Sequence, residues 1–186
     1  MKETVETWKR KSSKEIADCR VFKVREDLCE RESDKKESSF FVCENPDWVN
    51  VIALTKNKEV VLIEQFRHGI EEVILEIPGG MIDDDDEDTE TAARRELLEE
   101  TGFSSDKFIL LGKSRPNPAI QNNTVFHYLA PDCEKTEDVS FDEHESVLTK
   151  IVSLEDAKSL IADGTISHSL VIAAFYYFSI YHQKEK

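Results

Sequence analysis

The chain has 186 residues, of which 24 are Lys or Arg and 39 are Asp or Glu, so its formal net charge is −15. A chain of this length forms one compact domain by default. Its acidity repels nucleic-acid backbones and anionic membrane surfaces, so we expect neither as a partner. No stretch reaches the roughly 20 apolar residues that cross a bilayer, and the N-terminus has no apolar run of signal-peptide length. We therefore expect a cytoplasmic protein.

The first half of the chain is typical of a β-sheet. Residues 1–38 are polar and charge-rich, which favours short edge strands around loops. From Ser39 the runs FFVC, VNVIALT and EVVLIEQF predict strands, and Lys56-Asn57-Lys58 is a candidate hairpin turn between the last two. VILEI adds a strand that ends at Pro78-Gly79-Gly80, where proline and two glycines end regular pairing and free the backbone.

The second half adds helices. After an acidic run at Asp83–Asp88, TETAARRELLEET predicts a helix that Asp88 or Thr89 caps and Gly102 ends. FILLG, TVFHYLA and SVLTKIVS predict strands, with the acidic loop PDCEKTEDVSFDEHE before the last. Two helices, from about Ser153 to Gly164 and from about Ser167 to Tyr181, finish the chain. Strands interleaved with few helices indicate an α/β or α+β sandwich.

The predicted acidic helix carries three carboxylates on one face. Glu96, Glu99 and Glu100 stand at positions i, i+3 and i+4. Like charges so placed destabilise a helix by about 0.2–0.5 kcal/mol per pair unless a cation lies between them. The pattern indicates an oxygen-ligand site for Mg²⁺ or Mn²⁺, with a solvated acidic face as the alternative. Arg95, four residues before Glu99, is placed to orient that carboxylate.

The residues around this helix resemble a known family. R-E-L-L-E-E-T-G-F at Arg95–Phe103 resembles the R-E-apolar-x-E-E-x-G-apolar core of the Nudix box, with Glu87 eight residues before Arg95. E-I-P-G-G at Glu76–Gly80 and the segment Glu64-Gln65-Phe66-Arg67 are similar to motifs of the branch that acts on ADP-ribose and other nucleotide sugars. The resemblance runs from about Pro46 to Tyr177, and includes DEHE at Asp142–Glu145 and D-G-x-I at Asp163–Ile166.

The resemblance implies a fold and a reaction. The expected fold is a mixed β-sheet sandwiched between α-helices over residues 46–186, preceded by an N-terminal β arm over residues 1–45 that serves dimerisation. The expected reaction is metal-dependent hydrolysis of the pyrophosphate bond in a nucleoside diphosphate joined to a sugar, which releases a nucleoside monophosphate and a sugar phosphate. Members of this branch resemble one another in being homodimers whose N-terminal strands contribute to the partner's site.

One departure from the family pattern lies in the loop before the helix. Six residues separate Gly80 from Glu87, where the family has five. Either the loop bulges and Glu87 keeps the role of the first acid of the box, or Asp86 takes that position. The bulge is the preferred interpretation, because Glu87 keeps its register with the helix and loops absorb insertions at little cost.

The resemblance also implies roles for single residues. Glu96 and Glu100 would be the main metal ligands, Glu99 an assisting one and the carbonyl of Gly79 a further oxygen donor, for two or three Mg²⁺ or Mn²⁺ ions. Glu99 and Arg95 are also expected among the catalytic residues, with Arg95 orienting Glu99. The general base would come from the later acidic loop, where Glu143 is preferred over Glu145 and ordinary solvated acids are the alternative.

Substrate-binding residues are expected in two further segments. Arg67 is placed for a bidentate contact to a substrate phosphate, with a surface ion pair as the competing interpretation. Pro118 fits the proline-bearing loop of ADP-ribose enzymes, and Asn122 and Asn123 add amide groups suited to sugar hydroxyls or a base edge. The segment departs from the usual S-P-G of that loop, which leaves the identity of the sugar open.

Two other functions compete with this prediction. The first is a Nudix hydrolase of another diphosphate, such as a dinucleotide or a nucleoside triphosphate. The second is a Nudix-fold sensor that binds a nucleotide sugar without cutting it. Sensors often lose carboxylates of the box and carry a DNA-binding appendage, whereas this chain keeps all three helix glutamates and has no basic helix-turn-helix region.

Overall fold

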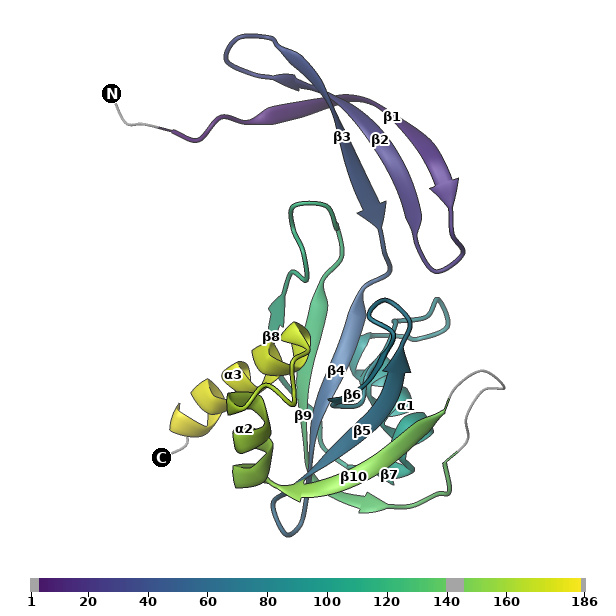
Figure 1. Ribbon diagram of the computed structural model, residues 1–186, viewed down its shortest axis with the longest axis vertical. Coiled ribbons are helices and arrows are strands. Elements are labelled where there is room, and N and C mark those ends of the chain that lie inside the picture. Colours follow the sequence, from purple (N-terminus) through teal and green to yellow (C-terminus); the bar gives the residue numbers. More distant parts are fainter. Residues whose placement is uncertain (1–3, 140–145, 185–186) are drawn as a thin grey trace. The chain divides into compact units, whose positions relative to one another are not determined.

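The computed structural model describes residues 4–139 and 146–184 (Figure 1). The chain forms two compact units. One unit contains the N-terminal segment up to Pro46 together with Arg115–Asn123. The other contains Asp47–Ser114 and the chain from Thr124 onward. Within the part of the chain that the structure describes, no helix is long and apolar enough to cross a membrane.

The first unit contains a three-stranded antiparallel sheet in the order β1-β2-β3. Its strands are β1 (Trp8–Asp18), β2 (Lys23–Arg31) and β3 (Glu37–Glu44). The prediction of short edge strands is wrong here, because β1 has 11 residues and β2 has 9. Nearly all of β1 is exposed, so no apolar alternation marks it in the sequence. Cross-strand charge pairs such as Lys23–Glu15 at 3.1 Å accompany the pairing.

Residues 115–123 join this first unit through β3. The backbone N–H of Cys43 donates to the carbonyl of Ile120 at 2.7 Å, and Cys43 forms a parallel bridge with Gln121. The N–H of Asn45 donates to the side-chain oxygen of Asn122 at 3.0 Å. The segment therefore leaves the sheet of the second unit after Ser114 and returns to it at Thr124.

The second unit is built on a mixed sheet. Its strand order is β10-β5-β4-β9-β7, with β6 paired to β5 and β8 paired to β9. Only β4 and β9 run parallel; the other pairings among the described strands are antiparallel. The strands are β4 (Trp48–Thr55), β5 (Glu59–Arg67), β6 (Glu72–Glu76), β7 (Phe103–Ser104), β8 (Ile109–Ser114), β9 (Val125–Lys135) and β10 (Val147–Ser153).

Every apolar run that predicts a strand forms one, but β9 is longer than predicted. It continues to Lys135, through the first residues of the segment expected to be an acidic loop. Asp132 has a positive φ of 53°, and the pairing with β4 shifts register near this point. An irregularity of this kind interrupts alternation, which explains why the sequence pattern indicates a loop.

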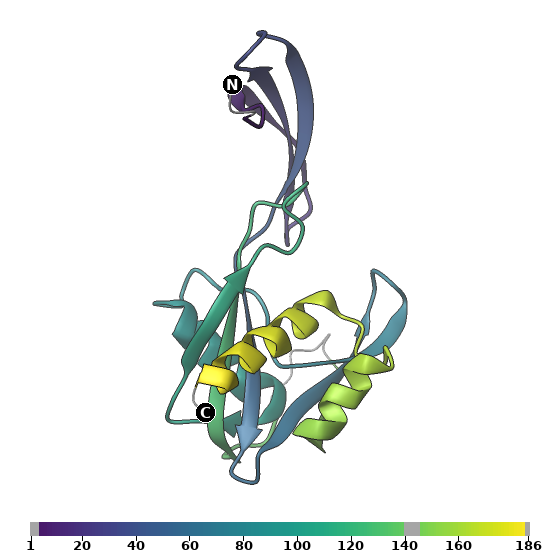
Figure 2. The ribbon, with the colours of Figure 1, turned by 90° about the vertical axis from the view of Figure 1, so that its left-hand side faces the viewer.

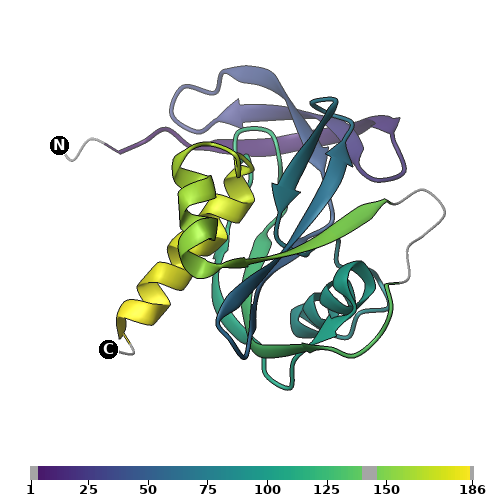
Figure 3. The ribbon, with the colours of Figure 1, turned by 60° about the horizontal axis from the view of Figure 1, so that its bottom comes forward.

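In the described part of the chain, three helices cover the sheet: α1 (Thr89–Thr101), α2 (Leu154–Ala162) and α3 (Ser169–Lys184). As predicted, Asp88 caps α1 by accepting from the N–H of Thr91, and Gly102 ends it in the left-handed conformation at φ 71°. Figures 2 and 3 show α1 on one side of the strands and α2 and α3 on the other. The predicted class, a mixed sheet sandwiched between helices, is confirmed.

Strand β4 lies at the centre of both cores. Val49, Val51 and Ala53 pack in the cluster that holds Leu97 of α1, whereas Ile52 and Leu54 pack in the cluster of α2 and α3. A strand that is buried on both faces has a continuous apolar run, as VNVIALT nearly has. Each buried branched side chain contributes about 1.5–3 kcal/mol. The two cores thus hold β4 in place, and the loop Pro78–Gly80 lies along the start of this strand.

Candidate active site

The glycine loop Pro78–Gly80 lies along the start of β4. The N–H of Val51 donates to the carbonyl of Pro78 at 2.8 Å, and that of Val49 donates to the carbonyl of Gly80 at 2.9 Å. A Cβ atom on Gly79 would lie 2.3 Å from the carbonyl oxygen of Val49, and Gly79 has a φ of 157° that L-residues rarely adopt. Only glycine at residue 79 therefore lets the loop approach the strand this closely.

Two carboxylates of α1 face this loop. The N–H of Gly79 donates to Oε2 of Glu100 at 2.8 Å. A Cβ atom on Gly80 would lie 2.5 Å from Oε1 of Glu96, so the loop backbone touches that carboxylate as well. Glu96 and Glu100 are one helical turn apart and both are largely buried. The structure thus brings together Gly79, Glu96 and Glu100, as the sequence predicts.

The charge of this cluster is incompletely compensated. Burial raises the pKa of Glu96 to about 7, against the lowering effect of Arg95, and the nearby carboxylates of Glu99 and Asp83 add to the rise. A buried carboxylate with neighbouring acids is a site where a cation lowers the free energy. The oxygen donors of Glu96, Glu100 and the loop backbone fit the chemistry of a hard divalent cation.

The third glutamate of the helix face, Glu99, is held by Arg95 and not by the glycine loop. Nη1 of Arg95 donates to Glu99 at 3.1 Å and to Glu96 at 2.9 Å. The contact with Glu99 is the one that the four-residue spacing predicts. Arg95 thus gathers these two side chains, whereas the backbone of Gly79 holds Glu100. Among residues 4–139 and 146–184, no group of three His, Cys, Asp or Glu side chains is arranged as a metal cluster.

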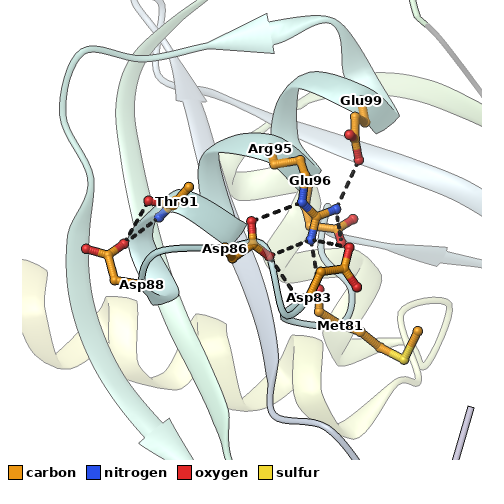
Figure 4. A network of polar contacts seen from close by, with 8 residues as sticks. All are labelled: Met81, Asp83, Asp86, Asp88, Thr91, Arg95, Glu96 and Glu99. Atoms are coloured by element: carbon orange, nitrogen blue, oxygen red, sulfur yellow. Dashed lines mark hydrogen bonds and ion pairs between the residues drawn. The ribbon is translucent and has the colours of Figure 1, made fainter.

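Arg95 also joins the helix to the acidic loop (Figure 4). Its Nε and Nη2 atoms donate to the two oxygens of Asp86 at 3.2 and 2.9 Å, and Nη2 donates to the carbonyl of Met81 at 3.0 Å. The side chain of Asp86 is only 5% exposed, and the hydrogen bond from Arg95 lowers its pKa. Glu87 is exposed. The preference for Glu87 is corrected: of these two candidates, Asp86 is the one that contacts Arg95 of the helix.

A second charged cluster precedes the glycine loop. Arg67, at the end of β5, donates from Nε and Nη2 to the two oxygens of Glu76 at 2.6 and 2.9 Å. Nδ1 of His168 lies 3.2 Å from the same carboxylate. Burial opposes ionisation of Glu76, but the two hydrogen bonds and the charge of Arg67, with the nearby His168 ring, prevail and lower its pKa to about 2. Arg67 is thus in an ion pair, and its partner is a buried acid.

The remaining predicted residues lie outside this cluster. Pro118, Asn122 and Asn123 belong to the first compact unit, whereas the carboxylates belong to the second. Pro118 is exposed, the side chain of Asn122 accepts from the backbone of Asn45, and Asn123 is 1% exposed, with no hydrogen-bond partner for its amide among the described residues. Glu143, the predicted base, lies outside the described residues.

Sequence reasoning missed two groups of polar residues. Glu76 and His168 join Arg67 in one cluster, and Asn50, Ser114 and His127 form a buried chain of hydrogen bonds. The missed signal was a polar residue inside an apolar strand run, as in VNVIALT and VFHYLA. Such a residue needs a buried partner, so each interruption marks a specific contact.

A mixed sheet between helices, with a glycine loop against two largely buried helix carboxylates, defines an α/β sandwich protein that gathers several oxygen donors at one point. Residues 45–175 match the protein-family model of the NUDIX domain, which is more than half of the chain. The chain belongs to the Nudix family. Nudix hydrolases generally need divalent metal ions.

Several proteins are similar to this chain. An ADP-ribose pyrophosphatase of Bacillus subtilis (strain 168) is 30% identical over 78% of each chain, and a methanol dehydrogenase activator of Bacillus methanolicus is 30% identical over 90% of each. A GDP-mannose pyrophosphatase of Yersinia pestis (strain Pestoides F) is 32% identical over 66% of this chain and 65% of its own. A crystal structure of an ADP compounds hydrolase has the same fold, with a TM-score of 0.85, 20% identity and 98% of each chain covered.

Proposed function

We propose that the protein hydrolyses the pyrophosphate bond of a nucleoside diphosphate linked to a sugar, such as ADP-ribose, and releases a nucleoside monophosphate and a sugar phosphate. The observation that carries the proposal is the approach of Gly79 and Gly80 to Glu100 and Glu96, which gathers buried oxygen donors at one point. Two similar proteins named as pyrophosphatases of ADP-ribose and GDP-mannose support the substrate class.

The metal would be two or three Mg²⁺ or Mn²⁺ ions. Their ligands would be Glu96, Glu100 and the carbonyl of Gly79, with Glu99 assisting. Bound divalent ions lower the pKa of a water and neutralise charge on phosphate oxygens. The chain's own part is to keep the donors in place. Arg95 supports this by holding Glu96 and Glu99 on the α1 side and Asp86 on the loop side.

Arg67 would contact a phosphate of the substrate. Because Glu76 accepts from its Nε and Nη2 atoms, the guanidinium is oriented before substrate arrives. Pro118, Asn122 and Asn123 would contact the sugar or the base, and Glu143 would act as general base toward the attacking water. These four assignments rest on the motif positions of the residues in the sequence.

The active form would be a homodimer. The sheet of the first unit supports this proposal, because it leaves large apolar side chains exposed, among them Ile16, Phe40 and Phe41 at 47%, 42% and 56%. Light scattering coupled to gel filtration tests it: a mass of one chain at micromolar concentration would contradict the dimer, and a mass of two would support it.

A product assay tests the reaction. ADP-ribose, GDP-mannose, UDP-glucose, NADH, diadenosine polyphosphates and nucleoside triphosphates are incubated with the protein and Mg²⁺ or Mn²⁺, and products are separated by ion exchange. We expect a nucleoside monophosphate from at least one nucleotide sugar. Glu100→Gln should abolish this product, whereas Glu87→Gln, which removes the same charge from an exposed residue, should preserve it.

Other outcomes separate the alternatives. Cleavage restricted to dinucleotides or triphosphates would keep the enzyme class and reject the sugar substrate. Tight binding of a nucleotide sugar without cleavage would favour a sensor and contradict the proposal. The complete set of helix glutamates favours the enzyme.

A further inference from the structure

A buried chain of hydrogen bonds crosses the second unit beneath the glycine loop. Asn50 interrupts the apolar run of β4 and is 7% exposed, and His127 interrupts that of β9 and is fully buried. The side-chain oxygen of Asn50 lies 2.7 Å from Nδ1 of His127, and Nε2 of His127 lies 2.8 Å from the hydroxyl of Ser114. The amide nitrogen of Asn50 donates to the carbonyl of Leu170 in α3 at 3.2 Å.

The donors and acceptors of this chain have one consistent order. A carbonyl only accepts, so the Asn50 amide must present its nitrogen to Leu170 and its oxygen to His127. Nδ1 of His127 must then carry the hydrogen, which leaves Nε2 to accept from Ser114. A neutral imidazole fulfils both roles, and burial lowers the pKa of His127 to about 4. The order fixes the rotamers of Asn50 and His127.

Asn50 lies directly against the glycine loop. A Cβ atom on Gly79 would be 2.7 Å from the Cα and 2.9 Å from the Cβ of Asn50, so the two residues already touch. The neighbours of Asn50 in β4, Val49 and Val51, hold the carbonyls of Gly80 and Pro78. The N–H of Gly79 in turn reaches Glu100. Because the loop meets the Cα and Cβ of Asn50, a displacement of Asn50 within β4 moves the loop relative to the carboxylates of α1, and the hydrogen bonds of its amide to His127 and Leu170 oppose such a displacement.

We propose that Asn50, oriented by His127, is a positioning residue that sets the distance between the Gly79–Gly80 loop and the carboxylates of Glu96 and Glu100. This inference rests on the proposed function for its kinetic consequences. It goes beyond that function in assigning a role to two residues outside the proposed ligand and substrate-binding sets. The role requires the hydrogen bond between Asn50 and His127, not merely a well-packed histidine.

Two substitutions at His127 distinguish a role of its hydrogen bond to Asn50 from a role of its packing alone. An Asn side chain places its amide nitrogen where Nδ1 was and keeps the donor to Asn50, whereas a Gln side chain places its amide where Nε2 was and keeps the contact with Ser114. Each variant loses one hydrogen bond. We expect His127→Asn to retain activity within about threefold, and His127→Gln to lower kcat and the affinity for Mn²⁺ about tenfold, with KM at saturating metal changed by less than about twofold.

The affinity for Mn²⁺ is measured directly, from the spin resonance signal of the free ion titrated with the folded protein. A further readout that needs no substrate is hydrogen exchange of the Gly79 amide, which the bond to Glu100 protects. We expect faster exchange at Gly79 in His127→Gln but not in His127→Asn, measured relative to Val61 within the core. Tyr177→Phe serves as control, since it removes a hydroxyl bond to the Lys113 carbonyl but keeps the ring stacked on His127.

The outcomes distinguish the two proposals. If wild type cleaves nothing on the panel while Gly79 exchange and Mn²⁺ affinity still separate the two variants, the proposed function fails and the positioning role stands. If both His127 variants match each other in kcat, Mn²⁺ affinity and Gly79 exchange, the positioning role is overturned, whatever their stability. A loss in Tyr177→Phe equal to that in His127→Gln would overturn it too, since any local loosening would then suffice.

Discussion

Nη2 of Arg95 donates to Oδ2 of Asp86 across 2.9 Å, and this bond joins α1 to the acidic loop before it. The Asp86 side chain is 5% exposed, and Asp86→Asn removes the charged acceptor that joins the guanidinium of Arg95 to this part of the loop. We expect the free energy of unfolding to fall by about 2 kcal/mol. The exposed Glu87 provides a matched control, because Glu87→Gln should change the free energy of unfolding by less than about 0.5 kcal/mol. Urea unfolding measures both; equal losses would contradict the assignment of Asp86.

Alanine substitutions at the two glycines of the loop should have different effects on stability and on Mn²⁺ binding. A Cβ atom on Gly79 would meet the backbone of β4, at 2.3 Å from the Val49 carbonyl, so Gly79→Ala should destabilise the fold by about 3 kcal/mol. The three atoms nearest to a Cβ atom on Gly80 all belong to the carboxylate of Glu96, the end of a side chain that can shift more easily than backbone. Gly80→Ala should therefore keep stability within about 1 kcal/mol and still weaken Mn²⁺ binding about tenfold. Thermal unfolding and Mn²⁺ titration together check the pair; a stable Gly79→Ala protein would refute the close approach.

Much of the fold could be predicted because its signals are local. Asp88 and Gly102 bound α1, since capping and a left-handed C-terminal residue depend only on their immediate neighbours. The long runs of β4 and β5 are predictable because both faces of these strands are buried. The helix carboxylates could be grouped for the same reason, since a period of 3.6 residues fixes their face.

The rest depends on contacts that spacing does not encode. The choice between Asp86 and Glu87 is decided by how an irregular loop reaches Arg95. The length of β1 could not be predicted, because its pairing with β2 buries almost no apolar face. Arg67 and Glu76 are nine residues apart and meet only because β5 and β6 form a hairpin. Tertiary pairing decides all three cases.

His127 predicts a pH dependence of stability. Its pKa is lowered by burial from 6.5 to about 4, so the folded state keeps the imidazole neutral where the unfolded state protonates it. Stability is unaffected above pH 6.5 and falls as the pH drops toward 4, by about 2 kcal/mol between pH 6.5 and pH 5. We expect His127→Asn to lose this slope. Chemical unfolding at intervals from pH 7.5 to 5 measures it, and parallel curves for the two proteins would show that His127 titrates normally.

Glu76 predicts a loss of stability of the same sign, but at lower pH. Its pKa falls from 4.5 to about 2 in the folded state, so its charged form contributes stability above pH 4.5 that is lost as the pH falls through 2. The pKa shift corresponds to about 3 kcal/mol of unfolding free energy. Solvent screens this interaction little, because the Glu76 side chain is 4% exposed. Glu76→Gln should therefore lower the free energy of unfolding at pH 7 by up to about 3 kcal/mol, since the amide keeps an acceptor for Arg67 but loses the charge.

The difference between wild type and Glu76→Gln should shrink as the pH falls below 4.5 and disappear near pH 2. Glu72→Gln is the matched control, because Glu72 is an exposed acid on the same strand. Urea unfolding of the three proteins from pH 7 to 2 gives the curves. A constant gap between wild type and Glu76→Gln over this range would mean that packing, not the charge shared with Arg67, holds Glu76 in place. A gap as large for Glu72→Gln would assign the effect to the net charge of the protein and not to this ion pair.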